Sequence, residues 1–177
     1  MSSVYIKRAQ VPDLKKIMNI IAQAQAMLKA DGSPQWQNGY LSLDTIKSDI
    51  LAQQCWVLIV DGKIAGTATL IIADDPNYRN ITDGHWKNTT DPYATIHRIA
   101  INPDYAGQHL GKIFISNLIS HSYQNGIRNF RIDTHLLNKR MQFLAKNSGY
   151  VHRGKIYVDE PAVNHEDNAR LAFELNL

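Results

Sequence analysis

The sequence predicts one α/β or α+β domain, spanning residues 1–177, around a mixed β-sheet. Two apolar runs, 56–60 and 63–72, are joined by Asp61-Gly62, which is a strong β-hairpin signal. A strand–helix–strand pattern follows over residues 94–134, and further apolar segments complete the chain. No linker, internal repeat or low-complexity tract divides the 177 residues. An antiparallel pair followed by a strand–helix–strand unit is typical of a mixed sheet.

The first half of the chain predicts a strand, two helices and the hairpin. Residues 4–9 alternate as a strand does. Pro12 and Asp13 open a helix with apolar residues at helical spacing, and Gly32-Ser33-Pro34 ends it. A second helix at 45–53 can be capped by Ser42 or Asp44, and it leads into the hairpin.

The second half begins with residues 73–92, a loop without periodicity. A loop this long in a compact domain is usually functional or disordered, and its Tyr78 and Trp86 argue against plain disorder. We then expect a strand at 94–101, a helix at 107–124, a strand at 130–134 and a helix at 138–146. Residues 150–158 and 171–175 read as closing strands, and an exposed strand at 171–175 could pair two subunits in a homodimer.

Composition narrows the class of protein. The net charge is only +3 and the basic residues are scattered, which argues against nucleic acid as the main partner. No apolar run has the length of a membrane span, and the N-terminus lacks the apolar core of a signal peptide, so we expect a cytoplasmic protein without a membrane partner. The single cysteine, Cys55, suits a reducing compartment and reads as a buried structural residue. No spacing typical of a metal site occurs.

The most informative segment is residues 93–112, where an alternating strand runs into a turn with two glycines and then an amphipathic helix. A helix N-terminus carries unpaired N–H groups and a partial positive charge, so it binds a pyrophosphate readily. Gly107 and Gly111 would let the backbone approach such a group closely. Alternatively, Gly107 is only a turn glycine and Gly111 only allows close helix packing.

These residues resemble the GCN5-related N-acetyltransferase (GNAT) family. Its cofactor signature, Arg/Gln-x-x-Gly-x-Gly/Ala, aligns with residues 106–111; Gly111 matches, whereas Ala106 and His109 replace a polar residue and a glycine. A second family feature, an Asn followed by a short helix and Gly-aromatic, is matched by Asn138 and by Gly149-Tyr150. The resemblance covers nearly the whole chain in element order. It implies a GNAT-like mixed, mostly antiparallel sheet flanked by helices.

The resemblance also implies a co-substrate and the residues that bind it. Acetyl-CoA would give its acetyl group to a primary amine of a small molecule or peptide, which attacks the thioester directly. A backbone N–H in the strand could hydrogen-bond the thioester oxygen as it becomes an oxyanion. Asn138 is equally well explained as a helix N-cap, and the strand residues as an ordinary buried strand. The implied cofactor-binding residues are Ile99, Ala100, Ile101, Ala106, Gly107, Gln108, His109, Leu110, Gly111, Lys112 and Asn138.

The catalytic groups are less clear from the sequence. The family often protonates the leaving thiolate with a tyrosine seven residues after the asparagine, a position that is Ala145 here. Either the thiolate leaves unaided, or another group substitutes, or the chain is a non-catalytic acyl-CoA-binding or sensor module. His97 is a candidate base near neutral pH, or else a hydrogen-bonded sheet histidine. Asp133 and His135 could form a carboxylate–imidazole pair, or each could find another partner.

The acceptor pocket is expected in residues 34–40 and 73–92. Aromatic side chains attract a cationic amine, and they are equally common as packing anchors of irregular loops. The sequence does not identify the acceptor. The candidate acceptor-binding residues are Trp36, Gln37, Tyr40 and Trp86.

Overall fold

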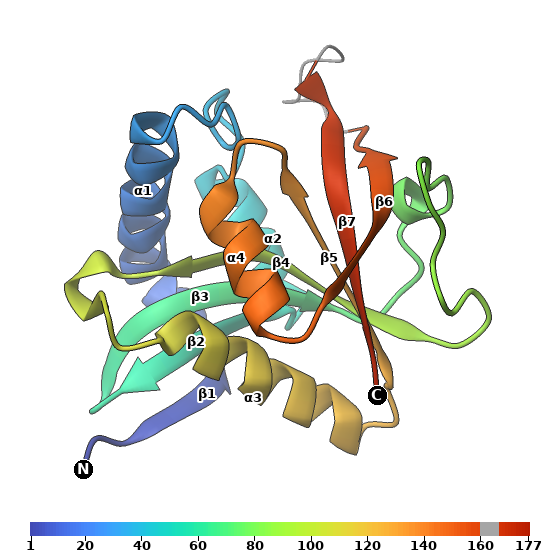
Figure 1. Ribbon diagram of the computed structural model, residues 1–177. Helices are drawn as coiled ribbons and strands as arrows, with labels where there is room; N and C mark the ends of the chain where they lie inside the picture. The colour runs from blue at the N-terminus through green and yellow to red at the C-terminus, as the bar shows by residue number, and fades with distance from the viewer. Residues whose placement is uncertain (160–166) are drawn as a thin grey trace.

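A seven-stranded mixed sheet forms the centre of the protein in the computed structural model, which describes residues 1–159 and 167–177 (Figure 1). The strand order is β1-β2-β3-β4-β5-β7-β6. Within the described residues β4 and β5 pair in parallel and every other neighbouring pair is antiparallel, as predicted. The strands are β1 (Val4–Arg8), β2 (Cys55–Val60), β3 (Lys63–Ile71), β4 (Tyr93–Ile101), β5 (Asn129–His135), β6 (Val151–Tyr157) and β7 (Ala169–Asn176).

Helices cover both faces of the sheet. α1 (Leu14–Ala30) and α2 (Leu43–Leu51) pack on one face, whereas α3 (Leu110–Gln124) and α4 (Lys139–Asn147) pack on the other (Figure 1). Alternate residues of β2 enter the two hydrophobic clusters, and all six residues are buried. Burial on both faces explains why 56–60 reads as a continuous apolar run and not as an alternating one.

Local turn chemistry explains the agreement at the hairpin and the difference at α3. Asp61 and Gly62 have φ of 47° and 77°, as the predicted tight hairpin turn requires. The helix expected from residue 107 begins instead at Leu110. A 3₁₀ turn, Pro103–Tyr105, follows β4, and Gly107 and His109 then adopt left-handed conformations that cannot belong to the helix.

β4 separates from β5 soon after the two strands begin to pair. The pairing joins Tyr93–Thr95 to residues 129–131, and beyond Thr95 no described residue of β5 pairs with β4. On its other side β4 has a bulge, since Arg98 and Ile99 together face Ala68 of β3. Arg98 has a φ of 54°. A bulge bends its strand, and here it accompanies the opening between the two parallel strands.

The closing strands differ from the sequence-based expectation in one respect. Residues 171–175 belong to β7, which lies between β5 and β6 and has no free edge. The expectation that two subunits pair through this strand is therefore wrong. The outer edge of β6 is partly covered, because Thr82 and Lys155 exchange backbone hydrogen bonds of 2.8 Å. A homodimer by another surface stays a prediction.

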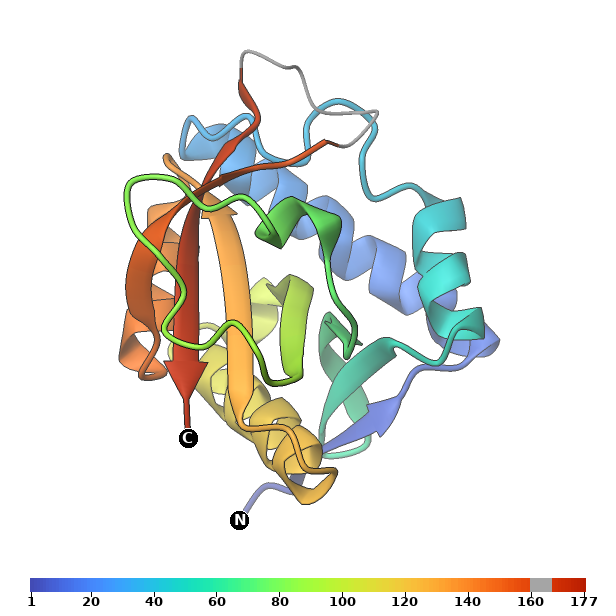
Figure 2. The ribbon, with the colours of Figure 1, turned by 90° about the vertical axis from the view of Figure 1, so that its right-hand side faces the viewer.

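The loop between β3 and β4 packs on the sheet and crosses β5 and β7 (Figure 2). It contains a 3₁₀ turn, Pro76–Tyr78, and it buries Tyr78 and Trp86 against Ile156 and Ala172. The aromatic residues noticed in the sequence therefore anchor the loop on the sheet.

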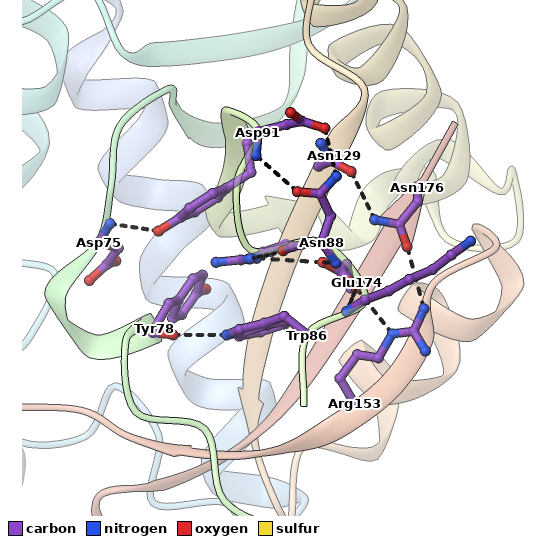
Figure 3. A network of polar contacts seen from close by, with 12 residues as sticks. Asp75, Tyr78, Trp86, Asn88, Asp91, Asn129, Arg153, Glu174 and Asn176 are labelled. Carbon is purple, nitrogen blue, oxygen red and sulfur yellow. Dashed lines mark hydrogen bonds and ion pairs between the residues drawn. The ribbon is translucent and has the colours of Figure 1, made fainter. Parts of the chain in front are cut away.

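Buried charges also fasten this loop (Figure 3). Glu174, which is fully buried, accepts hydrogen bonds from the Lys87 amide at 2.7 Å and from Arg153 Nε at 3.1 Å. Arg131 Nε lies 3.8 Å from the same carboxylate, and its guanidinium carbon lies 4.1 Å and 3.9 Å from the rings of Trp86 and Tyr93. A buried carboxylate that accepts several hydrogen bonds fixes the backbone around it. The Glu174 carboxylate therefore anchors the backbone of Lys87 on β7.

Two findings concern the described residues as a whole. None of their helices combines the length and the apolar character that crossing a membrane requires. Within residues 1–159 and 167–177, no three His, Cys, Asp or Glu side chains are grouped so that they could hold a metal ion.

Candidate active site

A cleft of about 280 Å³ lies where β4 leaves β5. Residues 96–101 of β4 form one wall, and Asn138, Met141 and Leu144 of α4 border it. Residues 34–38 and 40, between α1 and α2, form a further wall together with Asp75, Asn77 and Tyr78 of the β3–β4 loop. The cleft therefore collects segments that are far apart in the sequence.

The structure places four of the cofactor-binding candidates in this cleft: Ile99, Ala100, Ile101 and Asn138. Because β4 pairs with β3 alone at this point in the described structure, its other backbone edge borders the cleft. Unpaired strand N–H groups are suitable donors for a thioester oxygen. The asparagine is also the N-cap of α4, since its Oδ1 accepts a hydrogen bond from the Met141 amide at 3.0 Å.

Residues 106–112 are not among those that line the cleft, but the start of α3 lies beside it. A Cβ added to Gly111 would lie 3.2 Å from Leu144, which lines the cleft. The backbone amides of residues 107, 109, 110 and 111 have no hydrogen-bond acceptor within the described structure. Four free amides at a helix N-terminus form a suitable anion site.

The two glycines of the turn have different structural roles. Gly107 has a φ of +80° and open space where a side chain would be, so its conformation is what requires glycine. Gly111 has no such conformation, and it permits close packing of α3 against Leu144 of α4. His109 occupies the position of the family's middle glycine and has a φ of 54°. The left-handed backbone of that position is thus kept although the glycine is not.

His97 lies between two carboxylates in the cleft. Its Nε2 is 3.5 Å from Asp75 Oδ2, and its Nδ1 is 3.8 Å from Asp133 Oδ1. Tyr78 Oη donates a 2.7 Å hydrogen bond to Asp133 Oδ1. The imidazole is therefore flanked by carboxylates from the β3–β4 loop and from β5.

Hydrogen bonding and burial set the ionisation of the groups around His97. Burial opposes the charge of Asp75, but hydrogen bonds from His97 and from the Asn77 amide outweigh it and hold the pKa of Asp75 below its usual value. Burial, together with the charge of Asp133, raises the pKa of Tyr78 well above its usual value. Asp75 is therefore a carboxylate and Tyr78 a neutral hydrogen-bond donor at neutral pH.

Asp133 and His135 do not pair with each other. Asp133 meets His97 and Tyr78, while His135 Nε2 lies 2.6 Å from Asp167 Oδ1. His135 Nδ1 accepts a hydrogen bond from the Leu137 amide at 3.1 Å, so the proton resides on Nε2. The pair suggested between Asp133 and His135 is therefore absent, and the alternative holds: each residue has another partner.

The strand alternation also misleads at the next position. Alternation predicts that His97 and Arg98 face opposite sides, whereas both line the cleft, because Arg98 is part of the bulge in β4. Arg98 Nη1 lies 3.0 Å from Asp49 Oδ2, and its Nε donates to Tyr40 Oη at 3.2 Å. The sequence pattern predicts neither this bulge nor the ion pair between Asp49 and Arg98.

Three of the four acceptor candidates line the cleft: Trp36, Gln37 and Tyr40. Trp86 does not. It is buried behind Tyr78, at a ring separation of 5.5 Å, and its Nε1 donates to the Tyr78 carbonyl at 2.8 Å. The expectation that Trp86 contacts the acceptor is therefore wrong. Of these two aromatic residues, Tyr78 is the one that lines the cleft. The sequence analysis also missed Gln35, whose only signal is its place in the irregular segment.

Comparison with known proteins agrees with this geometry. The mixed sheet is split between its parallel strands, with a helix N-terminus beside the split, which is the arrangement that the family resemblance implies. The sequence profile of the acetyltransferase (GNAT) family matches residues 21–150. The chain therefore belongs to this family, which confirms the resemblance and the fold class.

Solved structures give the same fold over nearly the full length. A GNAT-family acetyltransferase from Streptococcus agalactiae is 33% identical, with a TM-score of 0.87, and the match covers 98% of this chain and 95% of that chain. The ribosomal-protein-S18-alanine N-acetyltransferase from Escherichia coli is 18% identical (TM-score 0.64, coverage 99% and 94%). The PaiA N-acetyltransferase from Thermoplasma acidophilum, solved with coenzyme A, is 16% identical (TM-score 0.69, coverage 99% and 99%). No curated protein matches the chain.

Proposed function

We propose that this protein is an acetyl-CoA-dependent N-acetyltransferase that acetylates a primary amine of a small molecule or peptide by direct attack on the thioester. The observation that carries the proposal is the open backbone edge of residues 99–101 next to the free amides at the start of α3. Acetyl-CoA would supply the acetyl group as a thioester. Its pyrophosphate suits the helix N-terminus, and its thioester oxygen suits a strand N–H.

The phosphate contacts would come mostly from the backbone. Ala106 offers no charge, and His109 has an exposed side chain but a fixed, left-handed backbone. Lys112 is exposed on the first turn of α3 and can add a positive charge. Asn138, which borders the cleft, is the remaining cofactor candidate.

His97 is the residue that we assign to accept the proton of the attacking amine. It lines the cleft between Asp75 and Asp133, and a neutral imidazole can act as a base near neutral pH. Removing a positioned general base typically slows a reaction about a hundredfold or more. We therefore expect His97→Ala to lower kcat by about that factor.

The leaving thiolate has no tyrosine donor at the family position. Ala145 lies on α4 and is fully buried in the core that α3 and α4 form with the sheet. It is not among the residues that line the cleft. A thiol has an ordinary pKa of about 8.5, so its thiolate is a tolerable leaving group without an acid. The same observation favours a second function, a non-catalytic acyl-CoA-binding or sensor module.

Two measurements test these functions. Calorimetry with CoA and acetyl-CoA measures cofactor binding, and release of the CoA thiol across a panel of primary amines measures turnover. Binding with turnover supports the transferase, and binding without turnover for any amine supports the module. Absence of binding contradicts both.

A variant pair locates the pyrophosphate. Gly111→Asp places a negative charge on the first turn of α3, whereas Ser116→Asp adds the same charge at an exposed position further along the helix. We expect the first change to weaken CoA binding about tenfold or more by charge repulsion, and the second to change it little. Equal affinities in the two folded variants would contradict the placement.

The fold alone does not determine which acceptor is acetylated. One structural neighbour is an aminoglycoside acetyltransferase solved with coenzyme A and kanamycin, and another is named for an alanine of a ribosomal protein. At 17% and 18% identity they share the fold with this chain. The acceptor of this protein has to be sought in its own side chains.

A further inference from the structure

The imidazole and the carboxylate that face each other across the split carry an inference about the acceptor, which rests on the proposed function. His97 lies on β4 and Asp133 on β5, beyond the last residues that pair the two strands. The distance between His97 Nδ1 and Asp133 Oδ1 is 3.8 Å, too long for a direct hydrogen bond. Both residues line the cleft. The space between the two atoms is thus bounded by a base and a negative charge.

Asp75 is the nearer of the two carboxylates to the ring of His97, at 3.5 Å against 3.8 Å for Asp133. Its Oδ2 lies 3.5 Å from Nε2, and its Oδ1 accepts the Asn77 amide at 2.9 Å. The carboxylate stays ionised, because its hydrogen bonds lower its pKa in spite of burial. An ionised carboxylate beside Nε2 favours the tautomer that carries its proton there. The lone pair is then on Nδ1, which faces Asp133.

Tyr78 fixes Asp133 from the other side. Its hydroxyl donates to Asp133 Oδ1 at 2.7 Å, and its ring is fully buried between the sheet and Trp86. A carboxylate oxygen can accept more than one hydrogen bond, so the bond from Tyr78 orients Oδ1 and leaves it able to accept another. The nearby cation Arg98 pairs with Asp49, at 3.0 Å, and not with Asp133.

We infer that the acceptor binds as an ammonium ion whose nitrogen lies between His97 Nδ1 and Asp133 Oδ1. A nitrogen about 2.9 Å from each atom fits a separation of 3.8 Å with ordinary hydrogen bonds. Asp133 is the residue that binds the charge, and Asp75 is a positioning residue that acts through His97. Aliphatic amines have a pKa of about 10.4, so at neutral pH they arrive as cations and need both a counter-charge and a base.

The proton balance follows from this placement. The ammonium ion gives one proton to His97 Nδ1 and becomes a neutral amine. The amine nitrogen then forms a bond to the thioester carbonyl carbon, the carbon–sulfur bond breaks, and sulfur keeps the electron pair. The nitrogen loses its second proton, which the thiolate takes up, and His97 returns its proton to solvent. The products are the amide, the free thiol and one proton.

The substrate class is therefore a primary aliphatic amine that is cationic and has no carboxylate next to the reacting nitrogen. A free amino acid would bring its own carboxylate close to Asp133 and Asp75, and like charges repel. An arylamine, which is neutral at pH 7, would gain little from Asp133. Among panel amines we expect amino-acid amides and diamines to exceed the matching free amino acids in kcat/KM.

The test uses the best amine of the panel with three variants of the full chain. Asp133→Asn keeps the shape and still accepts from Tyr78, but it removes the charge; we expect the KM for the amine to rise about tenfold to a hundredfold and the KM for acetyl-CoA to change less than about twofold. Asp75→Asn should lower kcat more than it changes the amine KM. Asp74→Asn is the matched control, since it removes the same charge from the same loop at a side chain outside the cleft.

The outcomes separate the inference from the proposed function. An unchanged amine KM in a folded Asp133→Asn protein overturns the inference while turnover persists. Equal rises in the KM values for amine and acetyl-CoA indicate a structural role and also overturn it. Tyr78→Phe, which removes only the hydroxyl, provides a milder second variant with the same expected direction. No turnover of wild-type protein with any amine contradicts the proposed function itself.

Discussion

Asn138, at the N-terminus of α4, donates its side-chain amide to Gln35 Oε1 over 2.9 Å, which joins α4 to the segment between α1 and α2. The side-chain oxygen of Asn138, Oδ1, accepts the Met141 amide and so caps α4. Gln35 Oε1 also lies 3.4 Å from both Thr134 Oγ1 and the His135 amide. One asparagine therefore starts a helix and holds one wall of the cleft in place.

This relationship separates the stability of α4 from the position of the wall. Asn138→Ser keeps a good N-cap but loses the donor to Gln35, whereas Asn138→Ala loses both. We expect the alanine variant to lose about 1 kcal/mol of unfolding free energy and the serine variant only a few tenths. Denaturant unfolding measures this difference.

The hydrogen bond between Asn138 and Gln35 should also affect amine binding, because Gln35 lies in the cleft wall between α1 and α2. Gln35→Ala should raise the KM for the amine as much as Asn138→Ser does, with no loss of the α4 cap, because both changes free the same segment. An amine KM that changes in the asparagine variants but not in Gln35→Ala would place the effect in Asn138 itself, as a direct ligand contact.

His109 is expected to be conformationally strained. Its left-handed backbone, with a φ of 54°, suits glycine better than histidine. We expect His109→Gly to raise the unfolding free energy by about 0.5–1 kcal/mol, or Tm by about 1–4 °C. Gly107→Ala, at a φ of +80°, should have the opposite effect. Calorimetric scanning measures both variants.

The same variant tests the source of the phosphate contacts. If backbone N–H groups hold the pyrophosphate, His109→Gly should leave CoA affinity within about twofold, because its amide is retained. A large loss of affinity would instead assign the contact to the imidazole.

Asp75 gives the protein an acid-sensitive contribution to stability. Its pKa in the folded protein lies below the ordinary value of 3.8, so the unfolded chain binds the proton more readily. The contribution is complete above about pH 5 and is lost as the pH falls through the lowered pKa. Between these limits the unfolding free energy of Asp75→Asn should fall less steeply with decreasing pH than that of wild type or Asp74→Asn. Parallel curves would contradict the hydrogen-bond assignment.

Cys55 should be unreactive in the folded protein. It is buried on β2, and burial raises the pKa of its thiol to about 11. A disulfide reagent at pH 8 should detect no thiol in native protein and one thiol per chain after unfolding. Rapid labelling of native protein would show that β2 opens. The expected result also makes thiol release from acetyl-CoA measurable without a background from the enzyme.

Much of the fold was predictable because its determinants are local. Asp61-Gly62 specifies a hairpin, Ser42 caps a helix, and Gly126 and Gly149 adopt left-handed conformations just past α3 and α4. The start of α3 was placed three residues too early, since the pattern of apolar residues does not show the 3₁₀ turn before it. Strand order was also hidden, because the pairing of β5 with β7 joins residues far apart in the chain.

The features of the site also divide into those that the sequence predicts and those that depend on tertiary structure. By itself the sequence determined the glycine turn, the asparagine cap and the apolar strand, since each depends on the backbone preferences of neighbouring residues. Only the tertiary structure decided that Trp86 is buried, that Tyr78 and Asp75 meet His97, and that Asp133 faces the imidazole from the next strand. The physical reason is that the site forms where β4 separates from β5, next to a bulge, and that distant segments pack around this opening. No short window of sequence contains that information.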